Sequence, residues 1–238
     1  DGLGDLFASF AKTGFAPYRS EWRDADYLLG RRGRRWLAPL GGGLCISAGW
    51  QFAGAPRDLS ALTLAVGVVA RRALADAAGI EVALKWPNDL VHDERKLGGI
   101  LLELAAEAQG RCYVVAGIGI NVALPPKSLS MLSDWPRGAI DLATARRGAA
   151  PPRLAVAARL LDGLGDLFAS FAKTGFAPYR SEWRDADYLL GRRVKLDDPA
   201  GPANGTARGI DGDGALLIET ANGARRRVIS GDVSVRSA

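Results

Sequence analysis

The stretch from residue 85 to residue 103 constrains the fold of this chain more than any other part of its sequence. Trp86-Pro87 interrupts an apolar segment, and because proline has no backbone N–H to give to a β-ladder, a strand must end there. The pair Asn88-Asp89 is typical of a turn. The polar run at residues 92–95 predicts a hairpin tip, and the next strand would begin near Lys96. We therefore predict two apolar strands with one short charged turn between them.

The charges of this hairpin favour an anionic ligand. Lys85, Asp89 and Lys96 would lie around the turn, and Gly98-Gly99 would let a ligand approach the backbone closely. A cation and an anion fixed in this way suit the joint binding of a carboxylate and a phosphate. The alternative interpretation is an ordinary β-hairpin that carries a basic residue and binds no ligand.

Composition indicates a globular chain without a histidine-based site. Its 238 residues are 48% hydrophobic, which is enough for one or two domains with a core. No apolar run is long and charge-free enough to span a bilayer. His92 is the single histidine, which excludes a His-rich metal site and a His-based nucleophilic triad elsewhere. Cys45 and Cys112 lack metal-ligand spacing, so we expect two buried thiols in a reducing cytosol.

Basic residues dominate the charged ones. The net charge is +5, and arginines gather in clusters, of which Arg225-Arg226-Arg227 is an example. A nucleic-acid surface is one interpretation of such clusters. The chain is also rich in alanine and glycine, so a GC-rich genome would explain the arginines equally. No helix-turn-helix pattern is legible, and we do not expect nucleic acid as a partner.

Residues 1–32 and 162–193 are identical, and the copies diverge at Gly33 and Val194. A solenoid would show drift between copies and at least a third unit. Identity over one long unit instead indicates a recent duplication, a recombination or an assembly error. We therefore interpret residues 1–32 as a duplicate of 162–193 that is not native to its position.

The second copy lies in a context that suits it. Pro151-Pro152 opens an apolar pattern with helical spacing, which Gly175 should end. A second helix is predicted from about residue 178 to residue 185, and a strand at residues 194–196. This part of the chain should therefore form a helical layer that leads into a β domain.

The rest of the pattern mixes strands and helices. A helix should run from about residue 58 to residue 78 and end at Gly79, and residues 123–152 are rich in loop signals. From about residue 192, short strands alternate with turns, which is the signal of a small all-β barrel. Further strands are expected at residues 44–50, 81–85, 99–104 and 111–118. The predicted fold class is α+β followed by that barrel.

Four motifs in order resemble the family of biotin protein ligases, the enzymes that attach biotin to a lysine of a carboxylase carrier. Lys85–Asp89 with Arg95–Glu103 is similar to the signature of the family. The other three motifs are Gly30–Trp36 with the strand after it, Gly117–Asn121, and the run from Gly209–Leu217 to Ser234–Ser237. The resemblance covers residues 30 to 238.

The resemblance implies a fold and a division of the chain. A mixed sheet with helices, like the catalytic domain of class II synthetases and biotin ligases, would span residues 33–190. A small C-terminal SH3-like β-barrel would span residues 191–238. The protein so implied is cytoplasmic and has no membrane partner, and whether it forms a homodimer is left open.

A two-step ligation is implied as well. The carboxylate of biotin, the substrate, would attack the α-phosphate of ATP to give biotinyl-5'-AMP. A lysine of biotin carboxyl carrier protein, an acetyl-CoA carboxylase subunit, would then attack the activated carbonyl. Both steps build negative charge on phosphate oxygens, so they need cations and backbone N–H groups rather than a nucleophilic side chain. Mg²⁺ is implied together with ATP.

By the same resemblance, Lys96, Asp89 and Arg31 are the candidate catalytic residues. Lys96 would contact the biotin carboxylate and the phosphoryl group, since a lysine is a compact charge. Asp89 would orient the incoming amine or a phosphate. The candidate biotin-binding residues are Lys96, Arg31, Trp36, Gly99, Leu101 and Gly117. The candidate nucleotide-binding residues are Arg32, Arg34, Lys85, Asn88, Asn121 and Arg236.

Three alternative functions stay open. In the family, the opening strands bring a Ser/Thr-Thr-Asn stretch and a glutamine to the biotin pocket, whereas this chain holds residues 26–29 there. An inactive remnant that binds nucleotide or carrier without turnover would follow from that loss. A lipoate or octanoate ligase shares the fold, although the spacing of Lys85–Asp89 and Arg95–Gly99 argues for biotin. A basic nucleic-acid binder is the third alternative.

Overall fold

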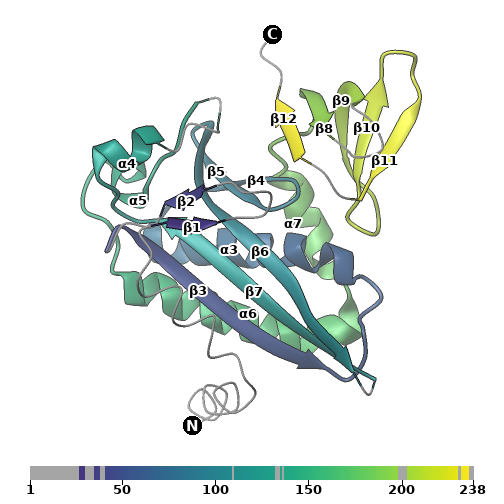
Figure 1. Ribbon diagram of the computed structural model, residues 1–238, viewed down its shortest axis with the longest axis horizontal. Coiled ribbons are helices and arrows are strands. Elements are labelled where there is room, and N and C mark those ends of the chain that lie inside the picture. The colour runs from purple at the N-terminus through teal and green to yellow at the C-terminus, as the bar shows by residue number, and fades with distance from the viewer. Residues whose placement is uncertain are drawn as a thin grey trace.

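The computed structural model describes residues 27–29, 35–37, 41–108, 110–131, 135, 137–197, 203–229 and 232–235 (Figure 1). Its main body is a five-stranded antiparallel sheet with helices against one face, and a second five-stranded sheet lies at the C-terminal end. This arrangement confirms the predicted α+β class.

The central sheet has the strand order β3-β7-β6-β5-β4, and every neighbouring pair is antiparallel. Its strands are β3 Gly43–Phe52, β4 Ala83–Lys85, β5 Asp89–His92, β6 Arg95–Ala108 and β7 Arg111–Asn121. The strand that should end before Trp86-Pro87 does end at Lys85. β3, β6 and β7 run further than predicted, because the ladder carries pairing through glycines and polar residues that have little strand preference of their own.

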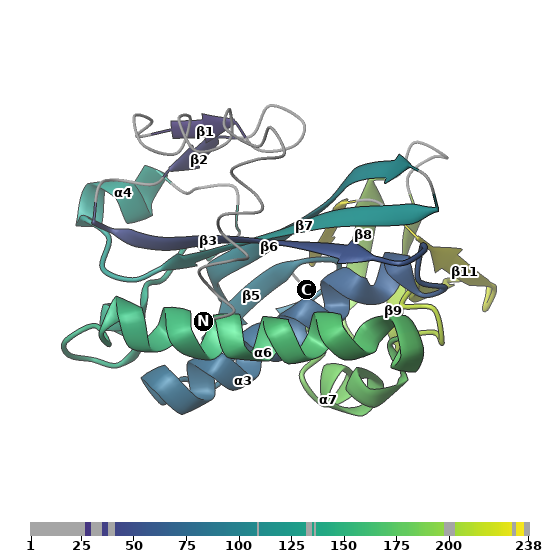
Figure 2. The same ribbon diagram turned by 90° about the horizontal axis from the view of Figure 1, so that it is seen from below.

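Helices cover one face of this sheet (Figure 2). After a short turn, η2 Leu59–Ala61, helix α3 spans Leu62–Ala78, and Gly79 ends it in the left-handed conformation, as predicted. Helix α6, Arg153–Thr174, runs beside α3 and ends before Gly175, which was also predicted. The second copy of the repeat therefore supplies most of one helix of this layer.

Close packing joins the two helices to each other and to the sheet. A Cβ at Gly163 of α6 would lie 2.7 Å from Cγ1 of Val69 in α3, so the helices touch at a position that holds no side chain. On the sheet side, Phe168 stacks on Trp50 with 5.8 Å between the ring centroids. These contacts fix α6 against both α3 and the central sheet.

The region expected to be loop, residues 123–152, contains two short helices, α4 Pro126–Met131 and α5 Leu142–Ala145. Buried Asp141 caps α5: its Oδ1 accepts a hydrogen bond from Thr144 N at 2.8 Å, and its Oδ2 accepts one from Leu124 N at 2.7 Å. A helix of one turn has too few residues to show an apolar period, so the sequence pattern did not reveal it.

The chain reaches its second sheet through η3 Ala177–Tyr179 and α7 Arg180–Asp185, where a single helix was predicted. The five strands are β8 Arg193–Asp197, β9 Ala203–Ile210, β10 Leu216–Thr220, β11 Arg225–Val228 and β12 Asp232–Val235. They pair in the order β11-β10-β9-β8-β12. The small β domain is confirmed, and within the described residues no ladder joins β11 to β12.

The two identical segments differ where both are described. Tyr27–Leu29 of the first copy is strand β1, which pairs with β2, Arg35–Leu37, on the sheet face opposite the helices (Figure 2). The same three residues of the second copy, 188–190, form a turn after α7 in which Leu189 is fully buried. The remainder of residues 1–32 lies outside the described residues.

Candidate active site

One row of the central sheet crosses all five strands and gathers several candidate residues. In register, the row consists of Lys85, Asp89, Gly99, Gly119 and Cys45. Residues paired in register point to the same face of a sheet. A Cβ added at Gly99 would lie 3.7 Å from Lys96 Cε and 3.8 Å from Asp89 Oδ1, so Lys96 joins this face.

The adjacent row points the other way, toward the helices. It consists of Leu84, Leu90, Gly98, Ile120 and Leu44. Leu84, Leu90 and Ile120 are almost fully buried. The row of charged and glycine residues is therefore on the face that the helices leave uncovered.

Asp89 binds both lysines of the hairpin. Its Oδ2 lies 3.2 Å from Lys85 Nζ, and its Oδ1 lies 2.5 Å from Lys96 Nζ. The side chains of Asp89 and Lys85 are only 12% and 10% exposed, whereas that of Lys96 is 39% exposed. Burial raises the pKa of the Asp89 carboxyl, but Lys96 and Lys85 outweigh burial and hold that pKa below its usual value. Two cations thus share one carboxylate, and the surplus positive charge lies on the more exposed lysine.

An aromatic ring holds the buried lysine. Lys85 Nζ lies 4.8 Å from the ring centroid of Trp135, which is within the range of a cation–π interaction. The Trp135 indole donates a hydrogen bond to Glu94 O at 2.8 Å. Lys85 therefore has two partners that fix its position, and Lys96 is the more accessible of the two cations.

Two asparagines fasten the segments that carry these charges. Asn88 donates from Nδ2 to Ile100 O at 2.6 Å, which ties the turn before β5 to strand β6. Asn121 donates from Nδ2 to Ile140 O at 3.0 Å, and its longer contact to Lys96 O is 3.4 Å. Both side chains lie next to the charged row, and the nucleotide-binding role predicted for them stays a prediction.

The glycines of the site serve two different purposes. A Cβ at Gly98 would lie 2.3 Å from Gly119 O, so this glycine is required by the pairing of β6 with β7. The expectation that Gly98 admits a ligand was wrong. At Gly99 and Gly117 the nearest atoms to an added Cβ are 3.7 Å and 3.6 Å away, which is ordinary contact. Neither glycine places a side chain on the face opposite the helices, and of the two only Gly117 is partly exposed, since Gly99 is buried.

The candidate residues fall into three groups. Leu101 pairs with Gly117 in the next row of the uncovered face, two positions from the Gly99 row. Trp36 lies in β2, at a position for which only the backbone is described. Arg31, Arg32, Arg34 and Arg236 lie outside the described residues. The structure therefore brings together the candidates of β4 to β7 and leaves the arginine candidates untested.

Sequence reasoning missed a cluster behind the lysines. Glu94 forms a two-point ion pair with Arg192, whose shorter contact is 2.7 Å, and accepts a hydrogen bond from Tyr188 Oη at 2.9 Å. Arg192 holds the pKa of Glu94 near 2, and Tyr188 adds to the effect. Arg192 also lies over the Tyr188 ring, 4.1 Å from its centroid. These residues are nearly a hundred positions apart in the chain, so no local motif could have indicated the contact.

Of the two cysteines, only Cys112 is buried as expected, because Cys45 is half-buried at the edge of the uncovered face. Burial raises the pKa of the Cys45 thiol, which keeps it protonated at neutral pH. Neither cysteine is thus placed as a nucleophile. Among the residues that the structure describes, no group of three or more His, Cys, Asp or Glu side chains could hold a metal ion.

The geometry is suited to anion chemistry on a backbone surface. A partly exposed ammonium, Lys96, stands beside Gly99, Gly117 and Gly119, which place no side chain on this face of the sheet. A planar or extended ligand can lie on such a surface and place a carboxylate or phosphate against the cation. No helix among the described parts of the chain is long and apolar enough to cross a membrane.

Family models match both sheets. Residues 29–121 match the model described as the Biotin/lipoate A/B protein ligase family, and residues 189–236 match the Biotin protein ligase C terminal domain. The first match contains the whole charged row and Lys96. The second contains all five strands of the C-terminal sheet.

Relatives and solved structures agree with these matches. The Bifunctional ligase/repressor BirA of Escherichia coli K12 is 37% identical over 88% of this chain, which spans only 63% of the length of that protein. The Biotin--[acetyl-CoA-carboxylase] ligase of Paracoccus denitrificans is 32% identical, with 79% of this chain and 78% of that protein covered. The solved biotin protein ligase of Aquifex aeolicus in complex with biotin and ATP superposes with a TM-score of 0.70 at 28% identity, covering 88% of this chain and 84% of that one.

Proposed function

This chain belongs to the biotin protein ligase family, and we propose that it activates biotin with ATP and transfers it to a lysine of a biotin carboxyl carrier protein. The observation that carries the proposal is the row from Lys85 to Gly119, with Lys96 beside it on the uncovered face of the sheet. Activation would give biotinyl-5'-AMP and pyrophosphate, and transfer would release AMP.

Lys96 would stabilise the charge that develops during activation. Its ammonium is partly exposed and is held by Asp89 at 2.5 Å, so it can meet the biotin carboxylate and the α-phosphate without a large rearrangement. A lysine on a flexible stem can stay with the phosphorus centre while the acyl–phosphate bond forms. We propose Lys96 as the main catalytic cation, and Arg31 as a second one.

The first role of Asp89 would be to hold the two lysines in place. Because its pKa is lowered, its carboxylate stays charged at neutral pH and fixes Lys96 and Lys85 in one geometry. An orienting role toward the amine of the carrier lysine, as predicted from the sequence, would use the same carboxylate. Asp89 is only 12% exposed, so the amine would have to approach along the face of the sheet that carries Gly99 and Gly117.

Binding of the substrates would follow the uncovered face. We propose that biotin lies on Gly99, Leu101 and Gly117, with Trp36 as a wall and Lys96 and Arg31 at its carboxylate. The nucleotide would be bound by Arg32, Arg34, Lys85, Asn88, Asn121 and Arg236. The lack of a side chain at Gly99 and Gly117 supports the first assignment, because a side chain at either position would project from the face that carries Lys96.

Magnesium would enter with ATP. The described residues offer no cluster of three or more carboxylate, imidazole or thiol groups, and the one carboxylate of the row, Asp89, is held by two lysines. A metal cage made by the protein does not fit this donor set. We therefore propose that the phosphates of ATP carry Mg²⁺, and we assign no step to a metal held by the protein.

The acceptor would be the biotin carboxyl carrier protein of acetyl-CoA carboxylase, the carboxylase named for the Paracoccus relative. We also propose a cytoplasmic location, where that carrier would be met. Homodimer formation stays a prediction that the mass of the protein in solution would test.

Biotin-dependent exchange of labelled pyrophosphate into ATP tests the activation step. We expect exchange with biotin and none with lipoate or octanoate, and transfer to carrier protein should disappear when the target lysine of the carrier is changed to arginine. Exchange with lipoate or octanoate alone would replace the proposal with a lipoate-type ligase. A folded chain without any exchange would instead be an inactive remnant, which the duplicated residues 1–32 give a specific reason to consider.

A further inference from the structure

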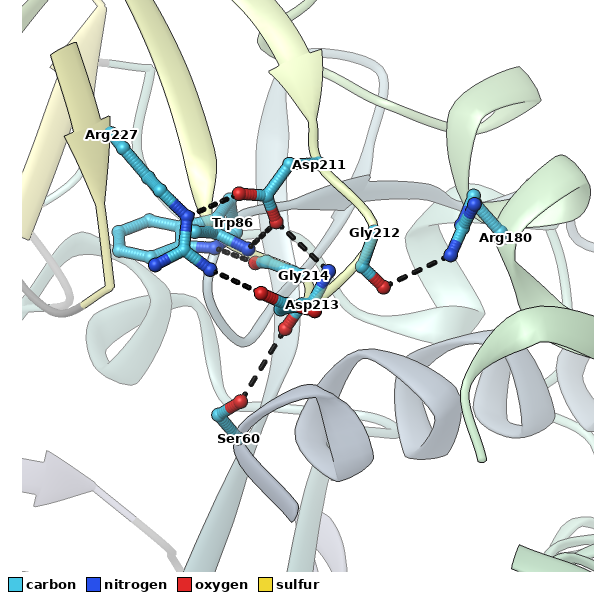
Figure 3. Close-up of polar contacts among 9 residues, drawn as sticks. Ser60, Trp86, Arg180, Asp211, Gly212, Asp213, Gly214 and Arg227 are labelled. Atoms are coloured by element: carbon cyan, nitrogen blue, oxygen red, sulfur yellow. Dashed lines mark hydrogen bonds and ion pairs between the residues drawn. The ribbon is translucent and has the colours of Figure 1, made fainter. Parts of the chain in front are cut away.

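The loop between β9 and β10 binds the domain that carries the candidate site through three successive backbone carbonyls (Figure 3). Gly212 O accepts from Arg180 Nη2 of α7 at 3.0 Å, and Asp213 O accepts from Ser60 Oγ of η2 at 3.4 Å. Gly214 O accepts from Nε1 of Trp86 at 3.0 Å. Three donors from three separate elements thus converge on one tight turn of the C-terminal domain.

Trp86 connects this turn to the candidate site. It directly follows Lys85 and comes three positions before Asp89, so it belongs to the turn that holds the charged row. Its side chain is 2% exposed, and a buried indole N–H needs an acceptor. The only acceptor recorded for it among the described residues is Gly214 O, which the other domain supplies. The buried position of Trp86 is therefore satisfied only when the C-terminal domain is docked.

The accepting turn is rigid before it meets Trp86. Asp211 Oδ1 accepts hydrogen bonds from Asp213 N at 2.9 Å and from Ala215 N at 3.0 Å. Arg227 of β11 forms ion pairs with both Asp211 and Asp213. The β domain thus presents its carbonyls in a fixed geometry, and docking does not have to order them.

Gly214 is the point of closest approach. Its φ is +81°, and a Cβ there would lie 2.8 Å from Leu64 Cδ1 and 2.9 Å from Ala61 Cβ. Any side chain would push the turn away from α3 and lengthen the bond to Trp86. Gly223, in the turn between β10 and β11, has the same conformation with φ +80°, but an added Cβ would meet no atom within 4 Å. Both glycines therefore adopt a positive φ, and they differ only in whether an added Cβ would clash with neighbouring atoms.

We propose that Trp86 is a positioning residue and that the Asp211–Gly214 turn, acting through it, holds Lys85 and Asp89 in the geometry needed to activate biotin. The turn before β5 would then be fixed from two sides: Asn88 ties it to β6, and Trp86 ties it to the C-terminal domain. The inference deepens the proposed ligase function and rests on it for the activity readout. Its structural part is independent of any activity.

The test compares Gly214→Ala with Gly223→Ala in the full chain. Both variants carry the same backbone strain, and the contact with Leu64 and Ala61 should add a further loss of stability in Gly214→Ala, which thermal unfolding would measure. Hydrogen exchange at the backbone amides of Trp86, Asn88 and Asp89 should speed up at least about tenfold in Gly214→Ala and stay unchanged in Gly223→Ala. Equal exchange in both variants would overturn the proposal even if the chain has no ligase activity.

The activity of the same variants separates positioning from mere stability. With a chain active in pyrophosphate exchange, Gly214→Ala should lower kcat about 10- to 100-fold with a smaller change in KM for biotin, while Gly223→Ala should stay within about twofold. Trp86→Phe keeps the buried ring and removes only the N–H, so it should produce the same pattern more weakly. A wild-type level of kcat in Trp86→Phe and Gly214→Ala would refute the positioning role. If the wild type is inactive in pyrophosphate exchange but the variants show the expected hydrogen-exchange pattern, only the ligase function is refuted.

Discussion

The two faces of the central sheet are built from alternate residues of the same strands, and they differ in burial and in charge. The covered face carries Leu84, Leu90 and Ile118, which are nearly fully buried against the helices. The opposite face carries charges at one end and has no side chain at Gly99 and Gly117. One face holds the fold together, and the other carries the candidate site.

This difference shows how a small domain separates stability from function. The period of two along a strand lets each residue be chosen for one face without disturbing the other. Gly117 and Ile118 are neighbours in β7, yet the first is partly exposed and the second is 1% exposed. Substitutions on the two faces should therefore affect different measurements.

The largest effect is expected at Lys96. Lys96→Ala removes the accessible cation and should lower biotin-dependent pyrophosphate exchange at least about 100-fold, the scale typical of one lost charge-stabilising group. The unfolding temperature should fall modestly, because Asp89, which is only 12% exposed, loses one of its two lysine partners and keeps the other. Lys173→Ala, at an exposed position on the last turn of α6, is the control and should keep full exchange. Unchanged adenylate formation in Lys96→Ala would contradict the catalytic role that we propose for this lysine.

On the covered face, Ile118→Ala should act on stability alone. Truncating a fully buried isoleucine costs about 2–5 kcal/mol of unfolding free energy, through lost burial and the cavity left behind. Urea unfolding followed by circular dichroism would measure it. A loss below about 1 kcal/mol would mean that the helices do not pack on this face as described.

The neighbouring position should behave in the opposite way. Gly117→Val adds a side chain to the uncovered face, where the nearest atoms to its Cβ lie 3.6 Å away, so stability should stay within about 1 kcal/mol. Biotin affinity, measured by calorimetry, should fall at least about tenfold, because the new side chain occupies the proposed pocket floor. Biotin binding that survives intact would move the pocket away from this glycine.

The smallest effect concerns the cluster at the hairpin tip. Arg192 lowers the pKa of Glu94 from 4.5 to about 2, so this carboxylate stabilises the folded state fully above about pH 4.5. That contribution is lost as pH falls from 4.5 toward 2, because the unfolded chain binds a proton that the folded chain resists. Glu94→Gln should therefore unfold more easily at pH 7 and should lose less stability between pH 7 and about pH 3.5. Urea midpoints at the two pH values measure the slope, and identical slopes in the two proteins would contradict the assignment.

Local sequence was sufficient for the end of β4 at the proline and for Lys96 near the start of β6. The prediction of a single turn between two strands was wrong, because Asp89–His92 forms a further strand, β5, that pairs with both neighbours. The pattern could not reveal Trp135 behind Lys85, because a contact across 50 positions of chain leaves no periodic signal. It also assigned Gly98 to ligand access, whereas pairing with β7 is what excludes a side chain there.

The repeat shows the limit of local sequence most directly. Tyr-Leu-Leu is a strand at residues 27–29, where β2 supplies a partner, and a turn at residues 188–190, where α7 and the C-terminal sheet enclose it. Arg192, which is the counterpart of Arg31 in the repeat, is held by Glu94, so the shared local sequence alone does not make it a ligand-binding arginine. Identical segments thus took different structures because their neighbours differ.

The sequence by itself determined the end of β4 before Trp86-Pro87, the helix ends at Gly79 and Gly175, and the composition of the charged turn, since these depend on backbone preferences of nearby residues. Only the tertiary structure decided that the charged row faces away from the helices and that Trp86 bonds to Gly214. Those outcomes depend on pairing register and domain docking, which bring together residues far apart in the chain and are set by burial over the whole molecule.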